Sequence, residues 1–77
     1  MAKGYSRDFI ELIQNADDSL LGVKLGGICV QNDIPVNDVA EFLKVTRMTI
    51  YNWFTGKTRV RGPYLEEVKK LIKKLEQ

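Results

Sequence analysis

Residues 36–56 constrain the fold of this chain more than any other stretch, because apolar residues recur at helical offsets on both sides of a short break. Before the break, Ala40 and Leu43 fall on one face of a helix. After it, Ile50 and Trp53 fall on the inner face of a second helix. This spacing predicts two short helices that pack nearly at right angles, with the second projecting outward.

The outward face of the second helix carries a mixed set of hydrogen-bonding and apolar side chains. Its members are Arg47, Met48, Thr49, Tyr51 and Asn52. Arginine and asparagine can bond base edges in the major groove of DNA, and an apolar side chain can lie against a thymine methyl group. The set suits nucleic-acid recognition better than catalysis.

Length and composition indicate one folded domain spanning residues 1–77. Of the 77 residues, 44% are hydrophobic, which is ordinary for a globular protein. No apolar run reaches the ~18 residues of a membrane span, and the start, MAKGYSRD, lacks the apolar stretch of a signal peptide. The single Cys29 cannot form an internal disulfide. Together these features predict a cytoplasmic protein.

The residues needed for an enzyme or a metal centre are scarce. The chain has no histidine, and its only thiol falls in a helix expected to be part of the core. A covalent catalyst needs a nucleophile beside a base, and zinc needs histidine or several cysteines. The paired carboxylates at 17–18 and 66–67 fit caps or solvated positions. We therefore expect no enzymatic activity, no metal and no cofactor.

Charge is distributed unevenly, although the net charge is only +2. Residues 1–43 hold three basic and seven acidic side chains, whereas residues 44–77 hold nine basic and three acidic ones. Such polarity is typical of a protein that sets one end against phosphates. Four lysines near the C-terminus can instead form a solvated helix face. That alternative leaves unexplained the cations around the motif: Lys44, Arg47, Lys57, Arg59 and Arg61.

Helical spacing on both sides of the motif makes the predicted fold all-α, with about five short helices. Ser6 can cap a leader helix over residues 6–17. Pro63 opens a C-terminal helix over residues 63–76, in which an apolar stripe lies opposite lysines.

Between the leader helix and the motif, a further helix is expected to run to about Asn32. Its start has three candidate caps, namely Asp17, Asp18 and Ser19. Its three glycines each lower helix propensity by roughly 1 kcal/mol, so they indicate close packing against another helix or a break near Gly26 and Gly27.

The two-helix motif has its own boundary signals and spans residues 36–55. Pro35 precedes its first helix, and Thr46 can cap its second. Gly56 suits the left-handed residue after the second helix.

These segments resemble the Cro/CI/Xre helix-turn-helix family, known from repressors of lambdoid phages, over about residues 20–75. LGVKLGGICVQNDIPVNDVAEFLKV is similar to that family's first two helices, and TRMTIYNWFTGKT to its recognition helix and the turn after it. PYLEEVKKLIKKL is similar to the helix that closes its core. The resemblance implies a compact lambda-repressor-like bundle in a bacterial or phage protein.

The chain departs from the family pattern at three places. Lys44 occupies the turn position usually held by glycine, which predicts either mild strain of about 1 kcal/mol or a slightly different turn. Cys29 and Phe54 occupy positions where the family often pairs arginine with glutamate, so we expect Phe54 to lie buried against Cys29. The segment before residue 18 is additional, and it is expected to cover core surface that a fifth helix covers in relatives.

The resemblance assigns base-edge contacts chiefly to Arg47, Met48 and Asn52. Arg47 either reads a guanine or touches only a phosphate. Asn52 either reads an adenine or is a solvated polar residue. Met48 either meets a thymine methyl group or is partly buried.

The remaining DNA contacts are expected to go to phosphates. Thr46 is first a cap, and its hydroxyl can also reach a phosphate. Thr49 and Tyr51 flank the groove, although Tyr51 can instead pack on the surface. The basic loop supplies further phosphate contacts through Lys57, Thr58, Arg59 and Arg61. Trp53 and Cys29 are expected in the core.

The sequence therefore predicts a sequence-specific regulator of transcription, a small Cro-type repressor that binds double-stranded DNA through residues 46–55. Few base contacts per monomer predict a homodimer on a palindromic operator. No ligand-sensing domain is expected. An alternative is a protein-interaction module on the same fold, of antitoxin or anti-repressor type, motivated by Tyr51, Trp53 and Phe54. A third reading is non-specific DNA coating by charge alone.

Overall fold

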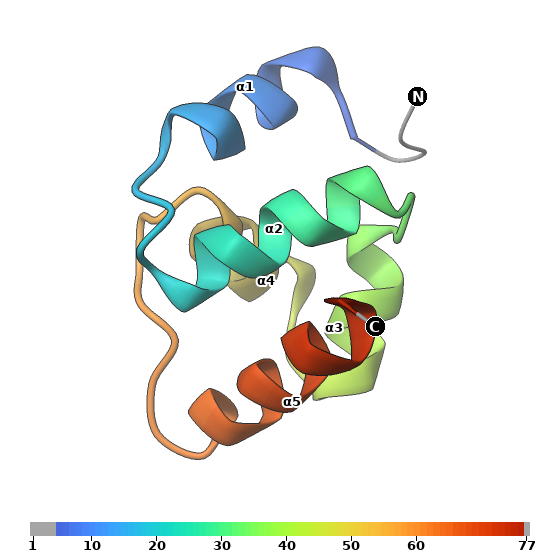
Figure 1. Cartoon of the computed structure of the whole chain (residues 1–77), viewed down its shortest axis with the longest axis vertical. Helices are drawn as coiled ribbons and strands as arrows, with labels where there is room; N and C mark the ends of the chain where they lie inside the picture. The colour runs from blue at the N-terminus through green and yellow to red at the C-terminus, as the bar shows by residue number, and fades with distance from the viewer. Residues whose placement is uncertain (1–4, 77) are drawn as a thin grey trace.

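The structure, a computed structural model, describes residues 5–76, and within this range the chain forms five helices and no strand (Figure 1). The helices are α1 (Arg7–Asn15), α2 (Leu21–Gln31), α3 (Val36–Leu43), α4 (Arg47–Phe54) and α5 (Tyr64–Glu76). The prediction of an all-α bundle of about five short helices is confirmed. Part of the expectation about a signal peptide falls on residues 1–4, which lie outside the described residues. None of the five helices is long and apolar enough to cross a membrane.

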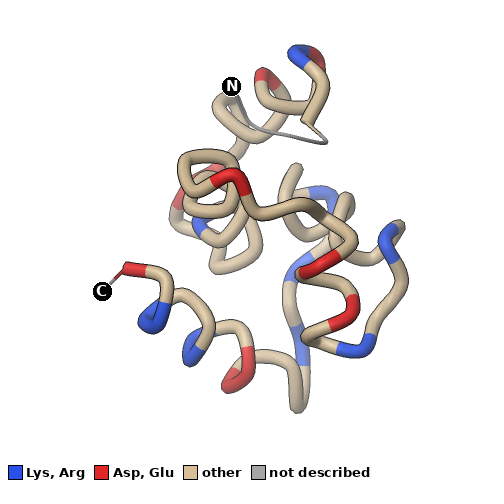
Figure 2. The backbone as a smooth tube through the Cα atoms, turned by 90° about the vertical axis from the view of Figure 1, so that its right-hand side faces the viewer, with Lys and Arg blue, Asp and Glu red and all other residues tan. Residues whose placement is uncertain are grey.

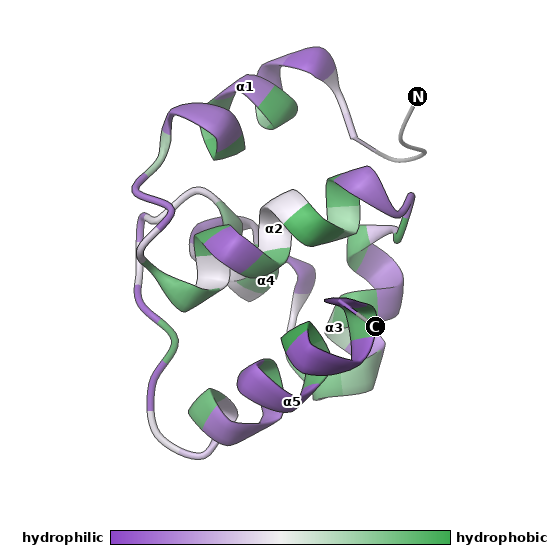
Figure 3. Cartoon of the chain, viewed as in Figure 1, coloured by the Kyte–Doolittle hydropathy of each residue, from purple (hydrophilic) through white to green (hydrophobic). Residues whose placement is uncertain are grey.

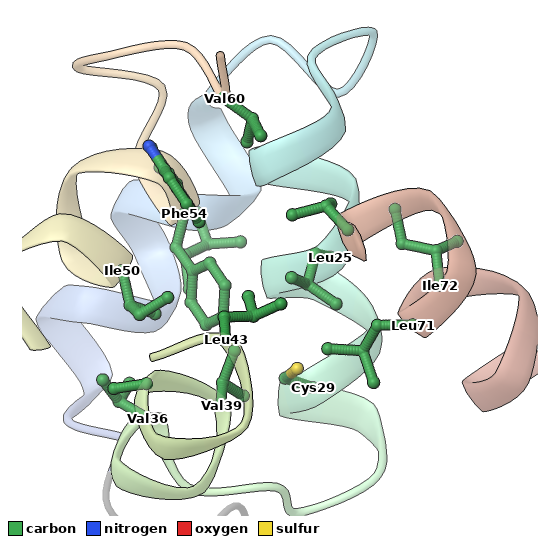
Figure 4. Packing of buried hydrophobic residues seen from close by; sticks show 14 of the residues in the cluster. Leu25, Cys29, Val36, Val39, Leu43, Ile50, Phe54, Val60, Leu71 and Ile72 are labelled. Atoms are coloured by element: carbon green, nitrogen blue, oxygen red, sulfur yellow. The ribbon is translucent and has the colours of Figure 1, made fainter. Parts of the chain in front are cut away.

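Helix α2 is the centre of the bundle. It packs against α1, α4 and α5, while α3 packs against α4 and α5. Figure 3 shows both hydrophilic and hydrophobic stretches around α1 and α5, as expected of helices that bury one face. The core between the helices contains residues from all five. Its fully buried members include Val68 as well as Leu25, Cys29, Ile50 and Phe54, and Figure 4 labels the last four.

Two of the three glycines in α2 sit where α4 approaches most closely. A Cβ on Gly22 would lie 2.6 Å from the carbonyl oxygen of Trp53, and a Cβ on Gly26 would lie 2.9 Å from Cγ of Phe54. A Cβ on Gly27 would meet nothing within 4 Å. The close-packing interpretation therefore holds for Gly22 and Gly26, and α2 runs without the break considered near Gly26 and Gly27.

The start of α2 differs from the sequence-based expectation. Its N-cap is Leu20, which makes no side-chain capping hydrogen bond. Asp17 instead closes a turn ahead of the helix, where its Oδ1 accepts hydrogen bonds from the backbone N–H and the hydroxyl of Ser19. The hydroxyl bond of Ser19, followed by its backbone bond, lowers the pKa of Asp17. The leader helix α1 does begin as predicted, because Ser6 Oγ accepts from the N–H of Phe9.

Burial of two weakly acidic groups predicts a loss of stability at alkaline pH. Burial raises the pKa of Cys29 from 9.0 to about 12, and it also raises the pKa of Tyr5, whose hydroxyl donates to the carbonyl oxygen of Ile34. Above pH 9 the unfolded chain releases protons that the folded chain retains. The free energy of unfolding should therefore fall as pH rises from 9 toward 12, by up to about 1.4 kcal/mol per pH unit for the Cys29 thiol. Tyr5 should add to the loss above pH 10, the ordinary pKa of its hydroxyl.

Urea unfolding at pH 8 and pH 10 would measure this loss. Cys29→Val removes one of the two groups and should flatten the decline. An equal decline in the Cys29→Val variant would show that the thiol is not responsible.

Candidate nucleic-acid interface

The turn between α3 and α4 sets the angle at which α4 leaves the bundle. Lys44 adopts the left-handed conformation, with φ 59° and ψ 45°, so of the two expected outcomes the strained turn is the one observed. The N–H of Val45 then donates to the carbonyl oxygen of Ala40 at 3.0 Å, which closes the end of α3. The strain at Lys44 is thus offset by satisfied backbone groups on both sides of the turn.

Two threonines, Thr46 and Thr49, form the N-terminal cap of α4. Thr46 Oγ1 accepts from the N–H of Thr49 at 3.2 Å, which confirms Thr46 as the N-cap. The two threonine hydroxyls also hydrogen-bond to each other at 2.9 Å. Their mutual bond holds both hydroxyls at the solvent-exposed start of α4.

The inner face of α4 is anchored in the core. Ile50, Trp53 and Phe54 are buried, and Phe54 is 0% exposed, as predicted. Phe54 and Cys29 belong to the same buried cluster (Figure 4), and Phe54 packs directly over Gly26, one helical turn before Cys29. Three anchors along eight residues leave α4 little freedom to rotate about its axis.

The outer face of α4 presents the predicted base-reading residues unevenly. Arg47 is exposed and Met48 is 67% exposed, whereas Asn52 is half-buried. Met48 is thus exposed, not partly buried in the core. Thr49 is also half-buried. The N-terminal turn of α4 is therefore the part most accessible to a partner.

Tyr51 lies at the edge of an aromatic row that joins α4 to the leader helix. Its ring meets the ring of Phe9 edge-on, with centroids 4.8 Å apart, and its side chain remains 37% exposed. Phe9 also stacks on Phe54 and on Tyr5. Sequence reasoning used Phe9 only for the helical spacing of the leader helix and predicted no contact between Phe9 and α4. The leader helix covers core surface at this position, and it braces α4 from the side.

The loop after α4 carries four more of the predicted contact residues. Lys57, Thr58, Arg59 and Arg61 are all exposed. The N–H of Thr58 donates to the carbonyl oxygen of Asn52 at 3.2 Å, and Val60 is buried, so the loop is tied to α4 and to the core. Gly56 makes the left-handed turn into the loop, with φ 77°.

A shallow depression lies between this loop and the start of α5. Its cationic lining consists of Arg59 and Arg61, and its floor includes the rings of Trp53 and Tyr64, whose centroids are 5.6 Å apart. Tyr64 was missed by sequence reasoning, although its place four residues before Val68 on the apolar face of the last helix was a signal. Cationic and aromatic side chains that line one depression suit a phosphate backbone with an exposed sugar or base.

Acidic groups and the only cysteine do not assemble into a metal site. Among residues 5–76, no group of three histidine, cysteine, aspartate or glutamate side chains is arranged to hold a metal ion. The chemistry offered by the surface around α4 is hydrogen bonding and positive charge.

No model of a protein family, no curated protein and no solved structure matches this chain. A function is therefore inferred from its own residues and their placement.

Proposed function

We propose that this chain is a sequence-specific regulator of transcription, a small Cro-type repressor that places residues 46–55 in the major groove of double-stranded DNA. One observation carries the proposal. Helix α4 buries Ile50, Trp53 and Phe54, while Arg47 and Met48 at its start lie in solvent. A helix anchored from beneath in this way can bring its first turn to base edges without disturbing the core.

Three side chains on α4 would read the sequence. Arg47 can donate two hydrogen bonds to a guanine, and Asn52 can pair with an adenine. Met48 is apolar and flexible, which suits a thymine methyl group. Half-burial restricts the rotamers of Asn52, so less conformational entropy is lost when it bonds a base.

Phosphate contacts would supply most of the affinity. The loop cations lie beside the carboxyl end of α4, and the threonine pair lies at its other end. Together they can bind the DNA phosphate backbone on both sides of the major groove that α4 enters. Neutralising several phosphates gives strong, salt-dependent binding that does not depend on sequence.

Membership of the Cro/CI/Xre family is part of the same proposal. The left-handed turn at Lys44, the capped start of α4 and the buried Phe54 beside Gly26 support it. A homodimer on a palindromic operator follows from the small number of base contacts that one copy can make.

The burial of the aromatic residues argues against the alternative of a protein-interaction module. Trp53 and Phe54 are buried, and the ring of Tyr51 packs edge-on against the ring of Phe9. The aromatic surface left for a protein partner on α4 is therefore small.

Selection of bound sequences from a random DNA pool at near-physiological salt tests the proposal. We expect an enriched palindromic motif. The double variant Arg47→Ala, Asn52→Ala should lose the enrichment, since it removes two base-reading groups. The matched control Lys69→Ala, Lys73→Ala removes two exposed charges from α5 and should retain the motif.

Two outcomes contradict the proposal. Recovery of unselected sequences would mean binding by charge alone, and its affinity would fall steeply with salt. Recovery of no DNA by a folded protein would favour a protein partner.

A further inference from the structure

The surface between α3 and α5 is apolar although it faces solvent. Ile34, Leu71 and Leu75 line a depression of about 210 Å³ there. Phe42 stands on the α3 side of it and is 55% exposed. Phe42 also lines a second depression, formed with the start of α5. Phe42 is common to the two depressions, which we call together the α3–α5 groove.

Charged side chains flank this groove in an alternating pattern. At the first depression, Asp38 on α3 lies across from Lys74 on α5. At the second, Lys44 at the end of α3 lies across from Glu67 on α5. All four are exposed. From the first depression to the second, the charge on the α3 side therefore changes from negative to positive, and the charge on the α5 side changes from positive to negative. In Figure 2 the helix that ends at the C-terminus shows this mixture, with blue segments between red ones.

We infer that a second copy of this chain docks on the α3–α5 groove and forms a two-fold symmetric dimer. A two-fold axis along the groove places α3 of one copy opposite α5 of the other. Asp38 then faces Lys74 of the second copy, and Lys44 faces Glu67 of the second copy. Symmetry repeats both pairs, so four opposite-charge pairs surround an apolar centre.

The charge pattern favours a second copy over another occupant. A surface must complement its own two-fold image to form such a dimer, and alternating opposite charges on facing walls meet that condition. The exposed ring of Phe42 would lie over the Leu71 region of the second copy, as an aromatic anchor inside a polar rim. The inference gives the proposed regulator its dimer surface, and only its biological purpose rests on the proposed function.

Sedimentation of the full-length chain without DNA tests the inference. We expect a monomer–dimer equilibrium at micromolar concentration. Phe42→Glu should weaken the dimer at least about tenfold, because a carboxylate would replace the aromatic anchor on both copies. The control Leu12→Glu alters an equally exposed residue, 58% exposed on α1, and should leave the equilibrium unchanged. Helical circular dichroism would check that both variants are folded.

Charge reversal provides a second test that a merely unstable variant cannot mimic. Asp38→Lys should weaken the dimer about tenfold, since it sets like charges together at two symmetric places. Adding Lys74→Asp to the same chain should restore the dimer to within about threefold of the original. Glu41→Lys changes charge on α3 outside the groove, and it should have a much smaller effect.

The outcomes separate this inference from the proposed function. A chain that stays monomeric at 100 µM or above, or a dimer weakened by Leu12→Glu and not by Phe42→Glu, overturns the α3–α5 dimer. Failure of the double charge reversal to rescue also overturns it. A dimer with these responses that binds no DNA supports the inference while contradicting the proposed function.

Discussion

Replacing Gly22 with alanine is expected to lower the free energy of unfolding by about 2 kcal/mol, although alanine favours helices. The new Cβ would lie 2.6 Å from the carbonyl oxygen and 2.8 Å from the Cβ of Trp53. Both neighbours belong to or adjoin the backbone of α4, so they cannot rotate away. Overpacking of this kind typically costs about 1–3 kcal/mol, from a total stability of roughly 4–12 kcal/mol for a domain of this length.

The same helix provides a matched control. A Cβ on Gly27 would meet nothing within 4 Å, so Gly27→Ala should stabilise the protein by about 0.5–1 kcal/mol through helix propensity alone. Gly26→Ala should be destabilising, since its Cβ would lie 2.9 Å from the ring of Phe54. Urea unfolding of the three variants at neutral pH measures the differences. Equal effects of Gly22→Ala and Gly27→Ala would contradict the close approach of α2 and α4.

Close packing of α2 on α4 also links stability to the proposed function. Trp53 and Phe54 rest on Gly22 and Gly26, and the same two residues anchor the helix that would enter the groove. A residue that pushes α4 outward would move Arg47 relative to the loop cations. Loss of DNA affinity in Gly22→Ala should therefore exceed what its unfolded fraction explains.

Features that depend on neighbouring residues were predictable from the sequence. Thr46 caps α4, Lys44 turns left-handed and Ser6 caps α1, because each depends on hydrogen bonds or backbone angles within a few residues. Burial of Phe54 was predicted only through the family resemblance proposed above, which sets Phe54 and Cys29 at paired positions. The exposure of Arg47 and the burial of Trp53 followed from helical spacing.

Three features were not predicted from the sequence, one of them local and two dependent on distant segments. Asp17 and Ser19 have the composition of helix caps, yet they bond to each other and leave Leu20 at the start of α2. The contact of Phe9 with Tyr51 joins segments that are far apart in the chain, and no local pattern specifies it. Phe42 has the residue type of a core position but lies exposed beside α5.

The largest functional effect is expected from Asn52→Ala. Loss of a two-bond contact with a base should cost about 1–3 kcal/mol at each half-site, and the loss should be confined to one base position per half-site. Thermal unfolding should change little, because the side chain of Asn52 is not part of the buried cluster, while its carbonyl oxygen still accepts from Thr58. Binding to the selected operator and to variants at each base position would measure the effect.

Lys57→Ala is the appropriate comparison, because it removes one exposed loop charge without touching the outer face of α4. It should weaken binding to every sequence alike and reduce the salt slope by about one counterion per copy. The two variants separate base recognition from charge neutralisation. A loss of affinity confined to one base position for Asn52→Ala, with an equal loss on every sequence for Lys57→Ala, fits a helix in the major groove. A uniform loss for both would remove Asn52 from base recognition and leave α4 as a charged scaffold beside the duplex.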